Sequence, residues 1–315
     1  LSLSEGTLDA NGQEIAVSGD WDNDSTFLPN GGNVIFQGTS LLSGSTPLTL
    51  SSTTISGTLQ VGSTPLSVTN AASLPVGGLL KLTTGSSITI TPELSVLGTL
   101  DMDEGELTLE NNLQIGGTID LSGGIASLTT NGSDCTILAG GTLSISGGTL
   151  NLPDVLDIWG NFTLSGNGVV QNTANTASFG DILFQNGSSG KMTGGSLRVF
   201  HQFEAKAGSK WKATAGTVYF GGTAQSVDVS VQDPAFTLFH LVVEYGVLTQ
   251  LMSSTTSPLD INGNLSILDE ASILPNGKMI EIAGDYYSEG AITGSGTITF
   301  DGTTNQTIDQ NDFEL

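Results

Sequence analysis

The stretch Leu94-Ser95-Val96-Leu97-Gly98-Thr99-Leu100 sets the pattern of this chain. Apolar residues alternate with small or polar ones up to a glycine, and an apolar residue returns two positions later. Such alternation is typical of a short β-strand that buries one face, and the glycine predicts a turn between two strands. The same frame recurs along the sequence, at residues 15–21, 113–119, 156–162, 259–265 and 280–286.

The glycines of this frame recur at intervals close to 20 residues. The separation is 19 residues for Gly98 and Gly117, 19 for Gly141 and Gly160, and 21 for Gly263 and Gly284. A repeat of this length, made of short strands and glycine turns, indicates a solenoid in which each repeat is one turn. Each turn has room for about three short strands, with corners at Gly, Asn-Gly or Pro-Asn-Gly.

We therefore predict an all-β fold, a parallel β-helix with about 20 residues per turn and roughly 14 turns. The general preference of parallel crossovers favours a right-handed coil. Residues 1–315 are expected to form one continuous domain, which is either complete or a segment of a longer repetitive protein. The residues expected to point inward are Val17, Phe36, Val96, Ile115, Ile158, Phe220, Ile261, Ile282 and Phe300.

Two stretches keep this register poorly. Residues 164–195 are rich in Asn, Gly and Ser, which predicts a turn with an enlarged loop. Residues 224–256, which contain the apolar run from Phe236 to Val243, are predicted to form a longer buried strand pair. Neither stretch has the composition of a linker between domains.

Composition excludes several functional classes. The chain of 315 residues carries 7 Lys and Arg against 31 Asp and Glu, a net charge of -24, so it cannot assemble a basic surface for nucleic acid. Hydrophobic residues make up 37% of the chain, enough for a continuous core, and 43 glycines argue against helices. No apolar run reaches the roughly 18 residues that a membrane-spanning helix needs. With one cysteine, Cys135, no intrachain disulfide can form.

Several segments resemble a known group of repeats. They are Val17–Trp21, Pro29–Gly31, Val34–Thr39, Val218–Val227, Phe239–Val243 and Leu259–Leu265. These segments look like the Gly/Thr-rich β-solenoid repeats of large bacterial surface proteins, the adhesins that use the type nine secretion route, and more distantly of filamentous-haemagglutinin-like exoproteins. In such families the solenoid is a stalk or adhesive rod without catalytic residues. The resemblance therefore implies an extracellular or cell-surface location and no enzymatic activity.

The basic residues gather in one part of the sequence. Five of the seven Lys and Arg residues fall between positions 191 and 212, together with a histidine and a tryptophan. This cluster is the best candidate for a patch that binds an acidic glycan or an acidic neighbouring subunit, and local charge balance on an acidic rod is the alternative. The candidate residues are Lys191, Arg198, His201, Lys206, Lys210, Trp211 and Lys212.

Two acidic clusters could hold calcium, a cation that takes oxygen ligands. Asp20, Asp22 and Asp24 alternate along one stretch, and a second group lies at residues 101–106. A solvated surface is the preferred interpretation of both clusters, and no cofactor is otherwise expected. Threonines at positions 58, 99, 118 and 142 suggest a short Thr ladder, which would suit an ice- or glycan-binding face.

The sequence as a whole favours an extracellular structural protein, a rod-like adhesin stalk or a filament-forming subunit. The alternative is a polysaccharide-active or glycan-binding β-helix protein. Because open solenoid ends expose unpaired strand edges, the expected partners are other copies or adjoining repeats, stacked end to end, and surface glycans are a further candidate. Neither nucleic-acid binding nor membrane insertion is expected.

Overall fold

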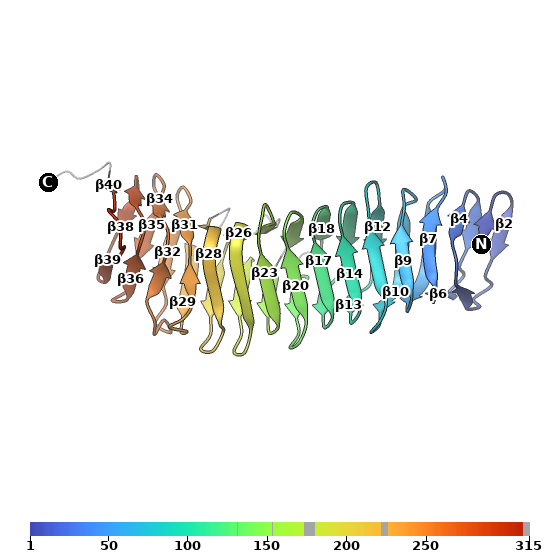
Figure 1. Ribbon diagram of the computed structural model, residues 1–315, viewed down its shortest axis with the longest axis horizontal. Helices are drawn as coiled ribbons and strands as arrows, with labels where there is room; N and C mark the ends of the chain where they lie inside the picture. The colour runs from blue at the N-terminus through green and yellow to red at the C-terminus, as the bar shows by residue number, and fades with distance from the viewer. Residues whose placement is uncertain (131, 153, 173–179, 222–225, 311–315) are drawn as a thin grey trace. The chain divides into compact units, whose positions relative to one another are not determined.

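The computed structural model describes residues 1–130, 132–152, 154–172, 180–221 and 226–310. The described residues form no helix, and their parallel strands stack as a β-solenoid of about 14 turns, about 21 residues apart (Figure 1). The predicted all-β parallel β-helix is confirmed, whereas its right-handed sense stays a prediction. Contacts divide the chain into two compact units, Leu1–Pro153 and Asp154–Leu315, where the sequence predicted one continuous domain.

In residues 1–153 most turns place one strand on each of three faces. The first face holds β1 (Ser2–Leu3), β4 (Trp21–Asn23), β7 (Thr39–Ser43), β9 (Thr58–Val61), β11 (Leu79–Leu82), β14 (Thr99–Met102), β17 (Thr118–Leu121) and β20 (Thr142–Ile145). The second face holds β8 (Leu48–Ile55), β10 (Leu66–Leu74), β12 (Ser87–Ile90), β15 (Glu106–Leu109), β18 (Ile125–Leu128) and β21 (Thr149–Leu152). The third face holds β3 (Ile15–Val17), β6 (Asn33–Phe36), the ends of β8 and β10, β13 (Leu94–Val96), β16 (Leu113–Ile115) and β19 (Cys135–Ile137). A separate pair is formed by β2 (Thr7–Asp9) and β5 (Thr26–Leu28).

Residues 154–315 repeat the three faces, and here the two longest strands, β26 (Ser189–Val199) and β28 (Trp211–Phe220), each span two faces. The first face holds β23 (Asn161–Leu164), the starts of β26 and β28, β30 (Thr237–Leu238), β33 (Leu259–Ile261), β36 (Met279–Ile282) and β39 (Thr297–Phe300). The second face holds β24 (Val169–Asn172), the ends of β26 and β28, β31 (His240–Val243), β34 (Leu265–Ile267), β37 (Tyr286–Ser288) and β40 (Ile308–Gln310). The third face holds β22 (Val155–Ile158), β25 (Asp181–Phe184), β27 (Gln202–Ala205), β29 (Ser226–Val231), β32 (Leu248–Leu251), β35 (Ser272–Leu274) and β38 (Ala291–Ile292).

Inward side chains stack in columns, because equivalent residues of successive turns pair in register. Leu100 pairs with Ile119, which pairs with Leu143, and all three are at most 2% exposed. Burial of such a side chain contributes about 1.5–3 kcal/mol. The prediction of inward positions is confirmed for eight of the nine residues, namely Val17, Phe36, Val96, Ile115, Ile158, Phe220, Ile261 and Ile282, all buried.

Phe300 departs from this prediction, because its side chain is 38% exposed. It pairs in register with the buried Ile282, so it has the inward orientation that the sequence indicated. Its ring contacts Tyr286, with the centroids 6.0 Å apart. In the described part of the chain no strand stacks beyond β39, and one side of Phe300 therefore stays open.

The apolar run from Phe236 to Val243 is also organised differently from the prediction. It is not one longer strand pair, because Phe239 separates the short strand β30 from β31, which lie on different faces. The enlarged loop predicted for residues 164–195 falls partly on residues 173–179, which lie outside the described residues.

Several frame glycines lie at the corner between the third and first faces, whereas Gly263 and Gly284 lie at the corner between the first and second faces. A Cβ atom on Gly117 would lie 2.1 Å from the carbonyl oxygen of Gly98, one turn earlier. A Cβ atom on Gly57 would lie 2.2 Å from the carbonyl oxygen of Gly38. Only glycine fits here, because successive turns touch backbone to backbone.

Candidate functional site

Outward polar side chains commonly tie one turn to the next. Asp20, Asp22 and Asp24 each accept a hydrogen bond from the residue 21 positions later, at 2.9, 3.0 and 2.7 Å. The hydrogen bonds from the backbone and side chain of Ser45 lower the pKa of Asp24. These calcium candidates thus join two turns, and the described residues contain no group of three or more His, Cys, Asp or Glu side chains that could hold a metal ion.

The second acidic cluster is engaged in the same way. Lys81 Nζ lies 2.7 Å from Asp103 Oδ2 and 3.1 Å from Asp101 Oδ2. The hydrogen bond to Asp103 and the one to Asp101 raise the pKa of Lys81, and the bond from Lys81 lowers the pKa of Asp103. Met102, between the two carboxylates, points into the core.

The predicted basic patch is not a single surface. Residues 191–212 make up one complete turn, since Lys191 pairs in register with Lys212. The side chains of this turn are therefore distributed around all three faces. Trp211 is a correction to the prediction: it is 1% exposed and belongs to the core. A sequence cluster as long as one turn disperses in space, because the chain winds once around the axis.

The remaining members of the predicted patch lie apart. Arg198, on the second face, pairs with Glu244 (Nη1 to Oε1, 2.5 Å) and stacks on the ring of Tyr219 at 4.6 Å. His201 Nδ1 lies 2.8 Å from Asp181 Oδ1, near the third face. Lys210 is exposed in the turn before β28.

Lys206 belongs to a different group, which we call the polar strip: Asp157, Trp159, Gln185, Glu204 and Lys206. Trp159, Gln185 and Lys206 each follow a third-face strand, β22, β25 and β27, on three successive turns. Backbone bonds keep them in register, because the N–H of Gln185 donates to the carbonyl of Ile158 (2.9 Å) and that of Lys206 to the carbonyl of Phe184 (2.9 Å).

Side-chain hydrogen bonds connect four members of the polar strip, and an ion pair adds Glu204. Trp159 Nε1 donates to Asp157 Oδ2 (2.7 Å), and Gln185 Nε2 donates to Asp157 Oδ1 (2.6 Å). Lys206 Nζ donates to Gln185 Oε1 (2.6 Å) and lies 4.0 Å from Glu204 Oε2. Gln185 is 5% exposed, whereas Trp159 is 46% exposed, so a buried amide fixes two groups that face solvent.

Sequence reasoning included Lys206 and missed the rest of the polar strip. Asp157 and Gln185 lie 28 residues apart, and although Asp157 belongs to the frame at residues 156–162, no frame identified in the sequence contains Gln185. One signal was present: Trp159 stands directly before the frame glycine Gly160, at a corner position.

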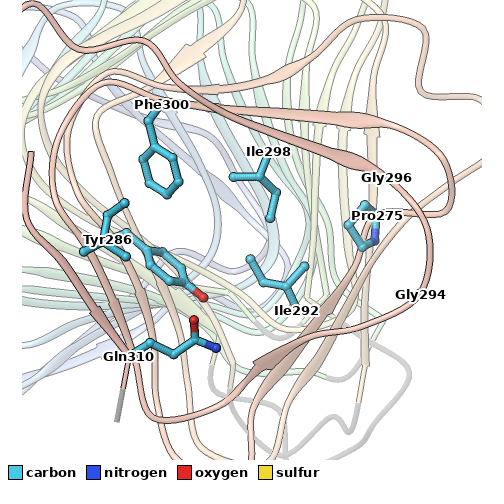
Figure 2. Close-up of a pocket in the computed structure, with 9 residues that line it drawn as sticks. Pro275, Tyr286, Ile292, Gly294, Gly296, Ile298, Phe300 and Gln310 are labelled. Atoms are coloured by element: carbon cyan, nitrogen blue, oxygen red, sulfur yellow. The ribbon is translucent and has the colours of Figure 1, made fainter. Parts of the chain in front are cut away.

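An open hollow of about 340 Å³ lies at the last described turn. Figure 2 shows Phe300, Ile298, Ile292 and Tyr286 around this hollow. Ile308, which also lines the hollow, is 58% exposed. The lining is the apolar interior of the solenoid, seen from the side on which no described strand follows.

The Thr ladder suggested by the sequence exists on the first face of residues 1–153. Thr58, Thr99, Thr118 and Thr142 occupy one outward column, which Thr39 extends and Leu79 interrupts. The neighbouring column is mixed and contains Gln60, Lys81, Asp101, Asp120 and Ser144.

A further group of carboxylates lies on the first face of residues 154–315. Asp260 pairs in register with Glu281. Burial, followed by the charges of Glu281 and Asp301, raises the pKa of Asp260 to about 6, and Lys212 opposes the rise. His240, near the start of the second face, accepts a hydrogen bond at Nδ1 from the N–H of Asn264 (2.9 Å), and burial lowers its pKa.

Comparison with known proteins adds no relative: no family model, curated protein or solved structure matches the chain. Within the described residues, no helix is long and apolar enough to cross a membrane.

Proposed function

We propose that this chain is a non-enzymatic structural solenoid of a bacterial cell exterior. It serves as a stalk or filament subunit, and further turns stack on its end along the axis. The observation that carries the proposal is the use of charged side chains as ties between successive turns. Asp20, Asp24 and Lys81 all bond to the adjacent turn. Carboxylates held in this way stabilise stacking and are not gathered around a common reacting centre.

The last described turn supports axial contact. No described strand pairs with the outer edges of β38, β39 and β40, and Phe300 and Ile308 are exposed beside them. Free strand edges with apolar neighbours pair with further strands. The next turn comes either from adjoining repeats of the same polypeptide or from another copy of the chain.

Sedimentation of the isolated chain tests this proposal. Whether the next turn comes from adjoining repeats or from another copy, the last described turn of the isolated chain is open and free to associate. We expect concentration-dependent association that strengthens with salt, since salt screens the mutual repulsion of molecules with a charge of -24. Ile308→Lys should abolish association. Val76→Lys, which alters a residue that is 83% exposed and far from β40 in the sequence, is the matched control and should not. A wild-type chain that stays monomeric at every salt and protein concentration would contradict the proposal.

The polysaccharide-active alternative is tested separately. The chain would be incubated with neutral and acidic polysaccharides, and new reducing or unsaturated ends would be measured. We expect none. Turnover that disappears when one carboxylate is replaced would overturn the structural proposal.

A further inference from the structure

We propose that the polar strip binds a neutral oligosaccharide, laid along the solenoid axis at the corner between the third and first faces. This binding goes beyond the structural role proposed above. The argument starts from Trp159, because it is the one tryptophan of three with an accessible ring: Trp21 and Trp211 are at most 1% exposed. An exposed indole presents a flat apolar surface on which the C–H face of a sugar ring can stack.

The indole is held in place. Its Nε1 donates to Asp157 (2.7 Å), and Asp157 is fixed in turn by the nearly buried Gln185 (2.6 Å). A side chain restrained in this way loses little entropy when a ligand stacks on it, so the platform is preorganised. Gln185 is a positioning residue, since it restrains both the tryptophan's partner and the ammonium group of Lys206.

The spacing of the strip suits a chain of sugar rings. Trp159 and Lys206 occupy the same corner position two turns apart, which is roughly 10 Å along the axis at the usual strand spacing. In an extended oligosaccharide, one pyranose ring advances the chain by a distance close to that between neighbouring strands, which is about 4.8 Å. A ring on Trp159 therefore places the hydroxyls of its second neighbour near Lys206 and Glu204.

The charges select the class of sugar. Two carboxylates, Asp157 and Glu204, accompany the single ammonium group of Lys206, on a chain whose net charge is -24. An acidic glycan would be repelled, whereas uncharged hydroxyls can both donate to the carboxylates and accept from the ammonium group. The ligand is accordingly a neutral oligosaccharide, which differs from the acidic glycan that the cluster of lysines suggested.

Tryptophan fluorescence gives a direct test, because quenching by acrylamide reports mainly on the accessible Trp159. The probes are cellohexaose, xylohexaose, mannohexaose and maltohexaose, with an oligogalacturonate as the acidic comparison. We expect at least one neutral hexasaccharide to protect the fluorescence from quenching with a Kd below about 1 mM, and the oligogalacturonate to bind at least tenfold more weakly.

Variants assign the binding to the strip and are measured by calorimetry, which does not depend on the tryptophan signal. Trp159→Ala and Lys206→Ala should each weaken binding at least tenfold. Tyr245→Ala, which removes an exposed aromatic residue outside the strip, and Lys210→Ala are matched controls and should bind as the wild type does. Failure of all four neutral probes, or unchanged binding by Trp159→Ala, would overturn the assignment. Self-association measured by sedimentation should be the same in Trp159→Ala as in the wild type, so this result and the structural proposal can fail independently.

Discussion

The corner between the third and first faces is built differently in the two units of the chain. In residues 1–153 it has at most four residues and often only two: Leu97 and Gly98 alone separate β13 from β14, and Gly116 and Gly117 alone separate β16 from β17. In residues 154–315 it is as short only between β22 and β23, where Trp159 and Gly160 lie; four residues separate β25 from β26 and five separate β27 from β28, and Gln185 and Lys206 lie in these longer corners. A short corner forces backbone contact between turns, whereas a longer one leaves room for polar side chains.

The two cores differ as well. Leu, Ile and Val fill most turns of residues 1–153, whereas residues 154–315 bury Phe162, Phe184, Phe203, Trp211 and Phe236 in mutual contact. Phe162, Gly190 and Trp211 occupy one column on successive turns. The Trp211 ring stacks on Phe162, with centroids 5.4 Å apart, across the position where Gly190 has no side chain. A large aromatic ring thus fills core space that a turn without an inward side chain leaves open.

The largest expected effect follows from this stacking. Trp211→Ala should lower the free energy of unfolding by about 3–5 kcal/mol, because Gly190 cannot fill the space that the indole leaves. Urea unfolding measures the loss, and hydrogen exchange locates it. Since each turn of a solenoid contacts only its neighbours, protection should fall around Phe162 and Phe184 and stay unchanged in residues 1–153.

Trp211→Phe is the matched variant, because it keeps a ring in the column and should cost clearly less. Equal losses for the alanine and phenylalanine variants would show that keeping a ring in this column does not stabilise the core. The contrast between the two cores would then have no energetic meaning.

The short corner gives the second prediction. Gly117→Ala should cost roughly 3 kcal/mol, since its Cβ would lie 2.1 Å from the Gly98 carbonyl oxygen and neither backbone can retreat freely. Gly77→Ala serves as the control. Gly77 has a φ of 87° and open space around it, so its replacement costs about 1 kcal/mol, through backbone strain alone. Thermal unfolding of both variants measures the difference, and equal losses would show that close approach does not require glycine at the corner.

Much of the fold could be predicted because a solenoid repeats one local rule. Alternation and glycine spacing predicted the strands, the corners and the inward columns, since each depends on a few neighbouring residues. Phe300 shows the limit of the rule: orientation follows from the alternation, whereas burial depends on whether another turn is stacked above it.

The surface groups were predicted poorly for a related reason. Their neighbours lie one turn away, and the length of a turn varies: Phe162 pairs with a residue 28 positions later, whereas Ile280 pairs with one 18 positions later. A small error in the predicted register between two turns therefore changes every predicted contact between their outward side chains. The basic cluster at residues 191–212 therefore dispersed, and the polar strip, with members up to 49 positions apart, went unseen.

The smallest expected effect concerns the charges on the first face. In residues 1–153 that face balances Asp101 with Lys81, whereas in residues 154–315 Asp260 stacks on Glu281. The folded pKa of Asp260, about 6, lies above the ordinary 3.8, so the folded state holds the proton more tightly and stability falls as the pH rises from about 4 through 6. Because this carboxyl is partly exposed and screened by solvent, Asp260→Asn should stabilise the protein by only about 1 kcal/mol at pH 7.5, and by nothing near pH 4.

Glu281→Gln removes one of the charges that raise the pKa of Asp260 and should flatten the pH dependence of the stability in part. Urea unfolding at several pH values measures the free energy of unfolding of both variants. An equal gain in stability from Asp260→Asn at pH 4 and pH 7.5 would show that ionisation of Asp260 beside Glu281 does not destabilise the fold.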